Sequence, residues 1–228
     1  TLALDKTGTL TQGTPKVSSV VPVADVAMAE VLQWGAALAK DSLHPISQAI
    51  HAAHPNSNWV LENWSEYSGQ GVQAEWRGRV LRMGRLSWLA SENVDVQSSV
   101  QMDNSGAWVS IDCQLLGFIQ VEDKLLPQAK KFVETFRTQG VSRCIMLTGD
   151  ESGEAGRIAE IIQFENIYSG LLPKEKLGQL NNEKNNQRRV LMVGDGINDA
   201  LALQAADVGI AIGDHLSAAA LGGADAAL

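Results

Sequence analysis

The chain has 228 residues, of which 45% are hydrophobic and 19% are charged, as in a soluble globular protein with a sizeable core. The formal net charge of -8 excludes a general nucleic-acid binder, which needs a basic surface. No stretch approaches the roughly 18 to 20 apolar residues of a membrane-spanning helix. The first residues already form an apolar strand pattern rather than a signal peptide, so we interpret the chain as an excised segment. Cys113 and Cys144 have no CxxC partner and are expected as buried strand residues.

The chain begins with a short apolar strand, Thr1–Leu4, that runs into Asp5. The pattern then changes, and all six tryptophans lie between residues 34 and 108. Helices are expected there at 27–39 and 45–53, and antiparallel strands over 69–84 and 108–121. We therefore predict an inserted α+β domain with an antiparallel sheet at residues 18–121.

From residue 122 onward, short apolar strands alternate with helices. Strands are expected at 141–147, 190–193 and 208–212, and helices at 128–139, 153–163, 174–185 and 198–205. This alternation predicts a doubly wound parallel sheet. We expect residues 1–17 and 122–228 to form one discontinuous α/β domain around the insert.

Three aspartates directly follow strands of the predicted parallel sheet. Asp5, Asp150 and Asp195 each come at the carboxyl end of a strand. In open α/β sheets, reactive groups collect at that edge. We therefore expect these three carboxylates to lie close together.

The segment Asp5-Lys6-Thr7-Gly8-Thr9-Leu10-Thr11 has the composition of a phosphoryl-transfer site. An aspartate at a strand end can act as a nucleophile, and a glycine-containing turn offers free backbone N–H groups to phosphate oxygens. A single aspartate in this position more often begins an ordinary turn. Seven specified residues together favour the functional interpretation.

This segment resembles the phosphorylation signature of P-type ATPases, which belong to the haloacid-dehalogenase-like superfamily. Further elements follow in the expected order. They are Thr148-Gly149-Asp150, which resembles TGD; Pro173 to Lys176, which resembles PxxK; and Gly194 to Asp199, which resembles GDGxND. The resemblance covers nearly the whole chain.

The resemblance implies that Asp5 takes the γ-phosphate of Mg-ATP to form an aspartyl phosphate. It implies three groups of residues. The catalytic residues would be Asp5, Lys176, Thr148 and Asp150. The ligands of Mg²⁺ would be Asp5, the Thr7 carbonyl and Asp195, and the residues that support this site would be Asn198 and Asp199. A lysine such as Lys176 would by itself be interpreted as a solvated helix charge, but the PxxK spacing favours contact with the phosphoryl group.

Thr7 occupies the position where related soluble phosphatases have a second aspartate that acts as general acid and base. Without that proton shuttle, the acyl phosphate should hydrolyse slowly. A long-lived phosphoenzyme suits a pump cycle better than a phosphatase.

The insert contains elements that resemble the nucleotide site of heavy-metal-transporting P-type ATPases. Ser42-Leu43-His44-Pro45 resembles SxHP, whose histidine helps to hold adenine, and Gly69-Gln70-Gly71-Val72 resembles GxGV. Gly84-Arg85 stands where Gly-Asn is common. Taken alone, these elements would be a helix start with proline in its first turn, a plain turn before a strand, and a solvent-facing arginine. Their joint presence favours ATP binding by His44, Gly69, Gly71, Gly84 and Arg85.

Two departures weaken the expected nucleotide site. Ala39 stands where the subfamily usually has a glutamate, and Leu43 replaces a frequent acidic residue. Loss of a carboxylate that accepts from the adenine amino group should cost roughly 1 kcal/mol or somewhat more, so we predict modest ATP affinity.

The sequence thus indicates the cytoplasmic catalytic part of a heavy-metal pump, with copper favoured over zinc or cadmium by Leu43 and Arg85. Its expected partners are ATP and, in the intact protein, its own membrane helices and actuator domain; the fragment itself should be monomeric. One alternative is a soluble phosphatase of the same superfamily. Another is a nucleotide-sensing module without chemistry.

Overall fold

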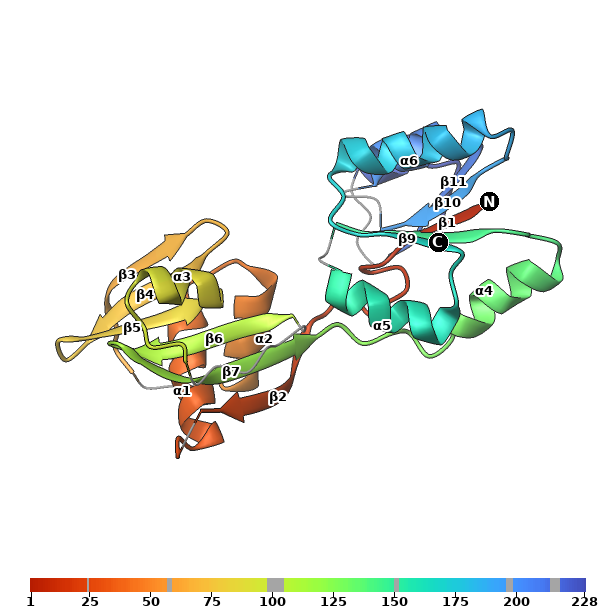
Figure 1. Ribbon diagram of the computed structural model, residues 1–228. Helices are drawn as coiled ribbons and strands as arrows, with labels where there is room; N and C mark the ends of the chain where they lie inside the picture. Colours follow the sequence, from red (N-terminus) through yellow and green to blue (C-terminus); the bar gives the residue numbers. More distant parts are fainter. Residues whose placement is uncertain (24, 57–58, 98–104, 150–151, 196–198, 214–217) are drawn as a thin grey trace. The chain divides into compact units, whose positions relative to one another are not determined.

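The computed structural model describes residues 1–23, 25–56, 59–97, 105–149, 152–195, 199–213 and 218–228. The chain forms two compact units, each of which has its own sheet (Figure 1). We call Thr1–Thr14 with Asp123–Leu228 the parallel-sheet unit, and Pro15–Glu122 the antiparallel-sheet unit. The predicted fold class, a parallel α/β sheet with an inserted antiparallel-sheet domain, is confirmed.

The amino-terminal crossing between the units differs by three residues from the expected boundary after residue 17. Strand β2 (Lys16–Pro22) pairs with β7 (Gln114–Glu122), so residues 16 and 17 belong to the antiparallel sheet. The sequence pattern had predicted no strand over residues 16–22.

The parallel-sheet unit contains six strands in the order β12-β11-β10-β1-β8-β9, and every neighbouring pair is parallel. The strands are β1 (Leu2–Asp5), β8 (Cys144–Leu147), β9 (Asn166–Tyr168), β10 (Leu191–Gly194), β11 (Val208–Ala211) and β12 (Ala226–Ala227). Strand β1 lies between β8 and β10, with Leu2 opposite both Cys144 and Leu191. All four residues of β1 are buried, as expected for a central strand covered on both faces.

Helices cover both faces of this sheet (Figure 1). Leu2 and Leu4 pack with α4 (Ala129–Thr138) and α5 (Ser152–Ile162), whereas Ala3 packs with α6 (Pro173–Asn185) and α7 (Ala200–Ala205). This alternation follows from the two-residue period of a strand. Helix α8 (Ala218–Gly223) precedes the edge strand β12.

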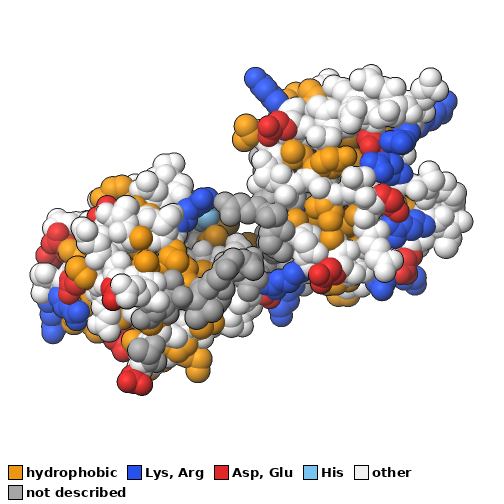
Figure 2. Space-filling model, in the orientation of Figure 1, with side chains coloured by type: hydrophobic (Ala, Val, Ile, Leu, Met, Phe, Trp, Pro, Cys, Tyr) orange, Lys and Arg blue, Asp and Glu red, His pale blue; other side chains and the backbone are white. Residues whose placement is uncertain are grey.

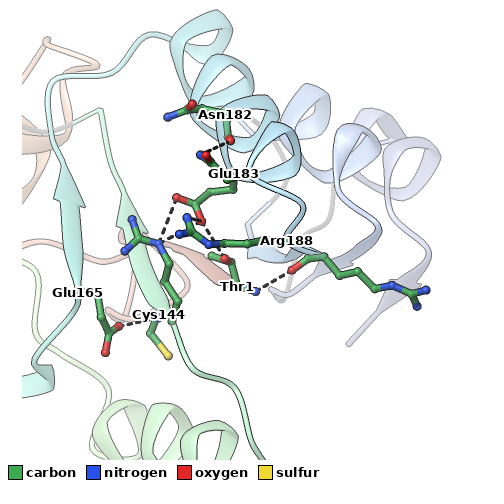
Figure 3. Close-up of polar contacts among 9 residues, drawn as sticks. Thr1, Cys144, Glu165, Asn182, Glu183 and Arg188 are labelled. Atoms are coloured by element: carbon green, nitrogen blue, oxygen red, sulfur yellow. Dashed lines mark hydrogen bonds and ion pairs between the residues drawn. The ribbon is translucent and has the colours of Figure 1, made fainter.

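A buried carboxylate organises the amino-terminal edge of the parallel sheet. Glu183 of α6 is 3% exposed. It accepts hydrogen bonds from the Thr1 hydroxyl at 2.8 Å, Arg143 Nε at 3.1 Å and Arg188 Nη1 at 3.0 Å (Figure 3). Burial raises the pKa of Glu183, but these donors outweigh that effect and the net pKa is lowered. The charged carboxylate therefore holds together residues that precede β1, β8 and β10.

The antiparallel-sheet unit has strand order β2-β7-β6-β5-β4-β3. Its remaining elements are α1 (Met28–Ala39), α2 (Pro45–Ala53), β3 (Glu62–Tyr67), β4 (Gly71–Trp76), β5 (Arg79–Gly84), α3 (Leu86–Ser91) and β6 (Gly106–Ile111). Residues of α1 and α2 form one hydrophobic cluster with the sheet, while Trp88 and Leu89 of α3 form a second cluster with Trp108 and Phe118. Each cluster is complete within this unit.

Cys113 corrects one expectation. Cys144 lies buried in β8, but Cys113 is exposed in the turn between β6 and β7. The preceding residue, Asp112, has φ of 51°, so the chain reverses here instead of continuing as a buried strand.

The surface carries mixed charge. On the face drawn in Figure 2, lysine and arginine side chains are interspersed with aspartate and glutamate. Among the helices that the structure describes, none is both long enough and apolar enough to cross a membrane.

Candidate active site

Asp5, Lys176 and Asp199 form a buried charged cluster at the carboxyl edge of the parallel sheet. Asp5 ends β1, Lys176 lies in the first turn of α6, and Asp199 immediately precedes α7. Lys176 Nζ lies 2.5 Å from Asp5 Oδ1 and 2.7 Å from Asp199 Oδ1. Since the residues are 5%, 4% and 0% exposed, water screens these charges little.

The start of α6 explains how Lys176 reaches the cluster. Pro173 occupies the first helical position, where its missing N–H costs nothing. Glu175 accepts a hydrogen bond from the Leu172 N–H at 2.7 Å, which fixes the helix entry. Lys176 then follows on the first turn with its stem buried.

The turn after Asp5 is held by its own backbone and by Thr11. Leu10 N and Thr11 N both donate to the Lys6 carbonyl. The Thr11 hydroxyl accepts from Gly8 N and donates to Asp123 Oδ2 at 2.5 Å. Gly8 has φ of 71°, and a Cβ there would lie 3.3 Å from the Asp195 Cβ. Glycine is therefore required both by the left-handed backbone and by the nearness of Asp195.

Burial and neighbouring charges shift the pKa values of the ionisable groups in the site. Burial and the Asp199 charge raise the pKa of Asp5 to about 7, against the opposing effect of Lys176. Burial also raises the pKa of Asp199. Burial alone would lower the pKa of Lys176, but Asp5 and Asp199 outweigh it and raise the pKa. Lys176 thus stays charged between the two buried carboxylates.

The carboxylates of Asp5, Asp195 and Asp199 could hold a metal ion, because one oxygen from each lies within 4.8 Å of the others. Asp199 Oδ2 is buried and has no hydrogen-bond partner among the described residues. Clustered carboxylate oxygens are the ligands that Mg²⁺ prefers. The donor set and the unpartnered Asp199 oxygen therefore fit a hard divalent cation.

A cavity of about 330 Å³ opens beside the charged cluster. It is lined by Asp5, Thr7, Thr148, Gly149, Leu171, Pro173, Lys176 and Asp195. Thr148 directly follows β8, and its backbone is tied to the 168–171 loop by hydrogen bonds to Tyr168 and from Leu171. The cavity thus has a potential nucleophile, a cation and a hydroxyl on its walls.

The structure brings together the predicted residues Asp5, Thr7, Thr148, Lys176 and Asp195 around this cavity. Asp150 and Asn198 lie outside the described residues. Asp199, expected only as a support, contacts Lys176 directly. Asp123 was not predicted; its position immediately after β7, where the chain re-enters this unit, was the available signal.

In the antiparallel-sheet unit, His44 caps the amino terminus of α2, where its Nδ1 accepts from the Ile46 N–H at 3.3 Å. Ser42, buried two residues earlier, accepts from the His44 N–H and donates to Glu66 Oε1 at 2.8 Å. Glu66 lies in β3, next to Tyr67, which pairs with Gly71. This chain of contacts ties the His44 loop to the sheet end that carries Gly71.

The glycines Gly71 and Gly84 pair with each other across β4 and β5. A Cβ on Gly84 would lie 2.3 Å from the Gln70 carbonyl oxygen and 2.9 Å from the Trp88 ring. Close strand packing under Trp88 therefore explains why these positions are glycine. Gly69 differs, since it has φ of 70° in the turn and nothing within 4 Å of a Cβ. Arg85 is exposed, and its N–H donates to the Gln70 carbonyl. The prediction that a nucleotide approaches these residues stays a prediction.

Comparison with known proteins agrees with this architecture. The sequence profile of haloacid dehalogenase-like hydrolases matches residues 1–207. A zinc-transporting ATPase of Bacillus subtilis is 35% identical over 100% of this chain and 36% of its own length. A probable copper-transporting ATPase, PacS, of Synechocystis sp. is 32% identical over 93% of this chain and 30% of its own length.

Solved structures show the same similarity. A structure described as showing conformational changes in the catalytic domain of the CPx-ATPase CopB-B upon nucleotide binding matches with a TM-score of 0.77 and 26% identity, over 98% of this chain and 82% of that one. A zinc-transporting PIB-type ATPase in its E2.Pi state matches with a TM-score of 0.76 and 31% identity, over 100% of this chain and 38% of that one.

The chain belongs to the haloacid dehalogenase-like hydrolase family. Within that family, the resemblance to the catalytic part of heavy-metal-transporting P-type ATPases is confirmed. The chain spans about a third of the length of these curated relatives, which include transporters of both copper and zinc.

Proposed function

We propose that this chain is the catalytic part of a heavy-metal-transporting P-type ATPase, in which Asp5 accepts the γ-phosphate of ATP. The observation that carries the proposal is the buried Asp5–Lys176–Asp199 cluster beside a cavity of about 330 Å³. The relatives support the reaction class, because they are ATPases that share both sheets of this fold.

The chemistry follows from the positions of the side chains. Lys176 holds Asp5 Oδ1, which leaves the other oxygen to attack the γ-phosphorus. The new Asp5–phosphorus bond forms as the bond to the β,γ-bridging oxygen breaks, and ADP leaves with that oxygen. Thr148 lines the cavity, and its hydroxyl would donate to a phosphoryl oxygen. Mg²⁺ bound by Asp5, Asp195 and the Thr7 carbonyl would offset the repulsion between two anions.

Thr7 determines how long the acyl phosphate lasts. It lines the cavity two residues after the nucleophile and offers a hydroxyl where a phosphatase would have a carboxylate. Since a hydroxyl is a poor general base, water attack on the aspartyl phosphate is slow. In the whole protein the phosphoenzyme would persist until the actuator domain arrives, and its energy would drive the membrane helices.

Copper is the first ion to test, with zinc or cadmium as the alternative. Leu43 in place of an acidic residue and Arg85 in place of asparagine favour copper, whereas the relatives include both metals at similar identity. Because the ion passes through membrane segments, transport assays require the whole protein.

Incubation with Mg²⁺ and γ-labelled ATP, followed by acid quenching, tests the reaction. We expect label on the protein that hydroxylamine removes and that Asp5→Asn abolishes. Asp112→Asn, which changes an exposed carboxylate of the antiparallel-sheet unit, is the matched control and should label normally. Rapid release of phosphate from small phosphomonoesters would favour the phosphatase alternative.

Labelled acetyl phosphate tests the phosphorylation of Asp5 separately from the use of ATP as donor, because acetyl phosphate needs no nucleotide site. Labelling of Asp5 by acetyl phosphate but not by ATP would retain the phosphorylation site and reject ATP as its donor. Absence of label from both donors would contradict the proposal.

A further inference from the structure

Glu66 places an exposed carboxylate beside the loop that carries His44. Its Oε1 accepts from the Ser42 hydroxyl at 2.8 Å, and Ser42 is 4% exposed. The Ser42 oxygen also accepts from the His44 N–H at 3.2 Å. Glu66 is thereby fixed through one oxygen, while its second oxygen is available to a ligand.

His44 has a defined tautomer. Its Nδ1 accepts from the Ile46 N–H, so in the neutral ring the proton resides on Nε2. The exposed edge of the ring is therefore a hydrogen-bond donor. Together, His44 and Glu66 present one donor and one acceptor on connected segments.

The sheet register places Glu66 on the face that the two long helices cover. Glu66 lies opposite Val72 in the antiparallel pair, so the two side chains project from the same face. Val72 is 2% exposed and packs in the cluster with α1 and α2. The Glu66 carboxylate lies at the rim of that cluster, next to the glycine-containing turn.

Position 39 provides no polar group to this region. Ala39 is 1% exposed and belongs to the same hydrophobic cluster. A base bound here would therefore find its carboxylate partner on β3 and not on α1.

One donor beside one acceptor matches adenine and excludes guanine-like bases. Along its N7 edge, adenine presents an acceptor at N7 and a donor at its 6-amino group. Guanine and hypoxanthine present acceptors at both N7 and O6, and a carboxylate repels the second of these. The charge of Glu66 thus gives discrimination as well as affinity.

We propose that Glu66 accepts the 6-amino group of adenine while His44 Nε2 donates to a ring nitrogen. Glu66 is then the residue by which this chain selects ATP. The proposal rests on the proposed function, in which the antiparallel-sheet unit binds the nucleotide. Ser42 positions both groups.

Calorimetric titration of the whole chain with ATP and with ITP tests this assignment. The wild-type protein should bind ATP about tenfold more tightly than ITP, as expected for one charge-assisted hydrogen bond. Glu66→Ala should weaken ATP binding about tenfold, whereas ITP binding should stay the same or become somewhat tighter because the repulsion of O6 is removed. Glu66→Gln should also reduce the ratio of ATP affinity to ITP affinity. It should do so by strengthening ITP binding, because an amide can donate to O6 of ITP.

Glu62→Ala is the matched control, since it removes an exposed carboxylate from the same strand and should change neither affinity. Tryptophan fluorescence and near-ultraviolet circular dichroism show whether each variant is folded. Equal losses for ATP and ITP in folded Glu66→Ala would mean that Glu66 only supports the Ser42 loop, and would overturn the proposal. Failure of the wild type to bind any nucleotide would instead reject the proposed function of this unit.

Discussion

The ammonium group of Lys176 contacts two buried carboxylates, those of Asp5 and Asp199, and the Asp195 carboxylate lies beside them. Because Lys176 bridges Asp5 and Asp199, it fixes their geometry. The raised pKa of Asp5 shows that burial and the Asp199 charge outweigh the effect of Lys176. If the proposed function holds, the site accommodates a cation and a phosphoryl group at the expense of its own stability when neither is bound.

The raised pKa of Asp5 predicts how replacing this residue by asparagine changes the stability of the protein. Burial and Asp199 raise the pKa of Asp5 from 3.8 to about 7, so the folded protein binds more protons than the unfolded chain between these values. The stability of the metal-free protein should therefore fall as pH rises through this window. In EDTA at pH 8, Asp5→Asn should raise the free energy of unfolding by up to about 4 kcal/mol, and by much less at pH 4.

Scanning calorimetry is the suitable measurement, since the tryptophans lie outside this unit. Mg²⁺ should raise the melting temperature of the wild type more at pH 8 than at pH 6, where protons compete for Asp5. The control is Asp207→Asn: a backbone hydrogen bond from Val190 lowers the pKa of Asp207, so its loss should not stabilise. Equal stability of wild type and Asp5→Asn at pH 8 would contradict the charge argument.

At the scale of elements, β4, β5 and α3 meet where only glycine fits. Gly71 and Gly84 allow the two strands and the Trp88 ring to approach within contact distance. The atoms nearest to an added Cβ on Gly84 belong to backbone and to a buried ring, which cannot move aside cheaply. The end of the sheet that carries the expected nucleotide site is therefore rigid.

Gly84→Ala should destabilise the antiparallel-sheet unit by about 3 kcal/mol, because overpacking forces the strand pair apart. Gly78→Ala is the control. Gly78 lies in the β4–β5 turn with φ of 76° and open space around it. The only cost of alanine there is the strain of the left-handed backbone, which should lower stability by about 1 kcal/mol. Urea denaturation followed by tryptophan fluorescence measures both. A Gly84→Ala protein of normal stability that no longer binds ATP would show that the nucleotide, not packing, requires this glycine.

At the scale of the molecule, each unit has a separate core. No described hydrophobic cluster includes residues of both units. The ends of the antiparallel-sheet unit lie side by side, since Lys16 pairs with Glu122. Excision at these points leaves every strand of its sheet paired.

We therefore expect a fragment of residues 15–122 to fold on its own. Trp34, Trp59 and Trp76 form a cluster with ring centroids 4.2 to 5.0 Å apart, so their fluorescence reports the folded state. The fragment should give the emission spectrum and the cooperative thermal transition that this unit shows in the whole chain. A fragment with exposed tryptophans and no transition would mean that the other unit is needed for folding.

The sequence predicted the two sheets and most residues of the parallel-sheet site, because their signals are local. Asp5, Lys176 and Asp195 occur in short motifs, and alternating strands and helices mark the sheet around them. It did not predict β2 or β3, whose exposed faces carry polar residues. The pairing partner of β2, strand β7, is also distant in sequence.

Contacts between segments that are distant in the chain could not be predicted from the sequence either. The bonds from Thr11 to Asp123 and from Ser42 to Glu66 depend on the completed fold. The glycines at 71 and 84 were interpreted as part of a nucleotide site, with a plain turn before a strand as the alternative for Gly71. Nothing local in the sequence indicates that Trp88 packs on them. Asp199 likewise gained its contact with Lys176 only through the meeting of α6 and α7.

The central position of β1 has a consequence for biosynthesis. Both neighbours of this strand, β8 and β10, are encoded more than a hundred residues later. A ribosome therefore completes the antiparallel-sheet unit, which can fold as a finished domain, while Leu2–Asp5 still awaits its partners. Until residue 147 emerges, the apolar strand that ends in Asp5 has no partner, and until residue 194 emerges it keeps one open edge that is exposed to misassociation. Because the inserted domain folds first and its two ends lie side by side, it shortens the loop that must close when β8 and β10 pair with β1.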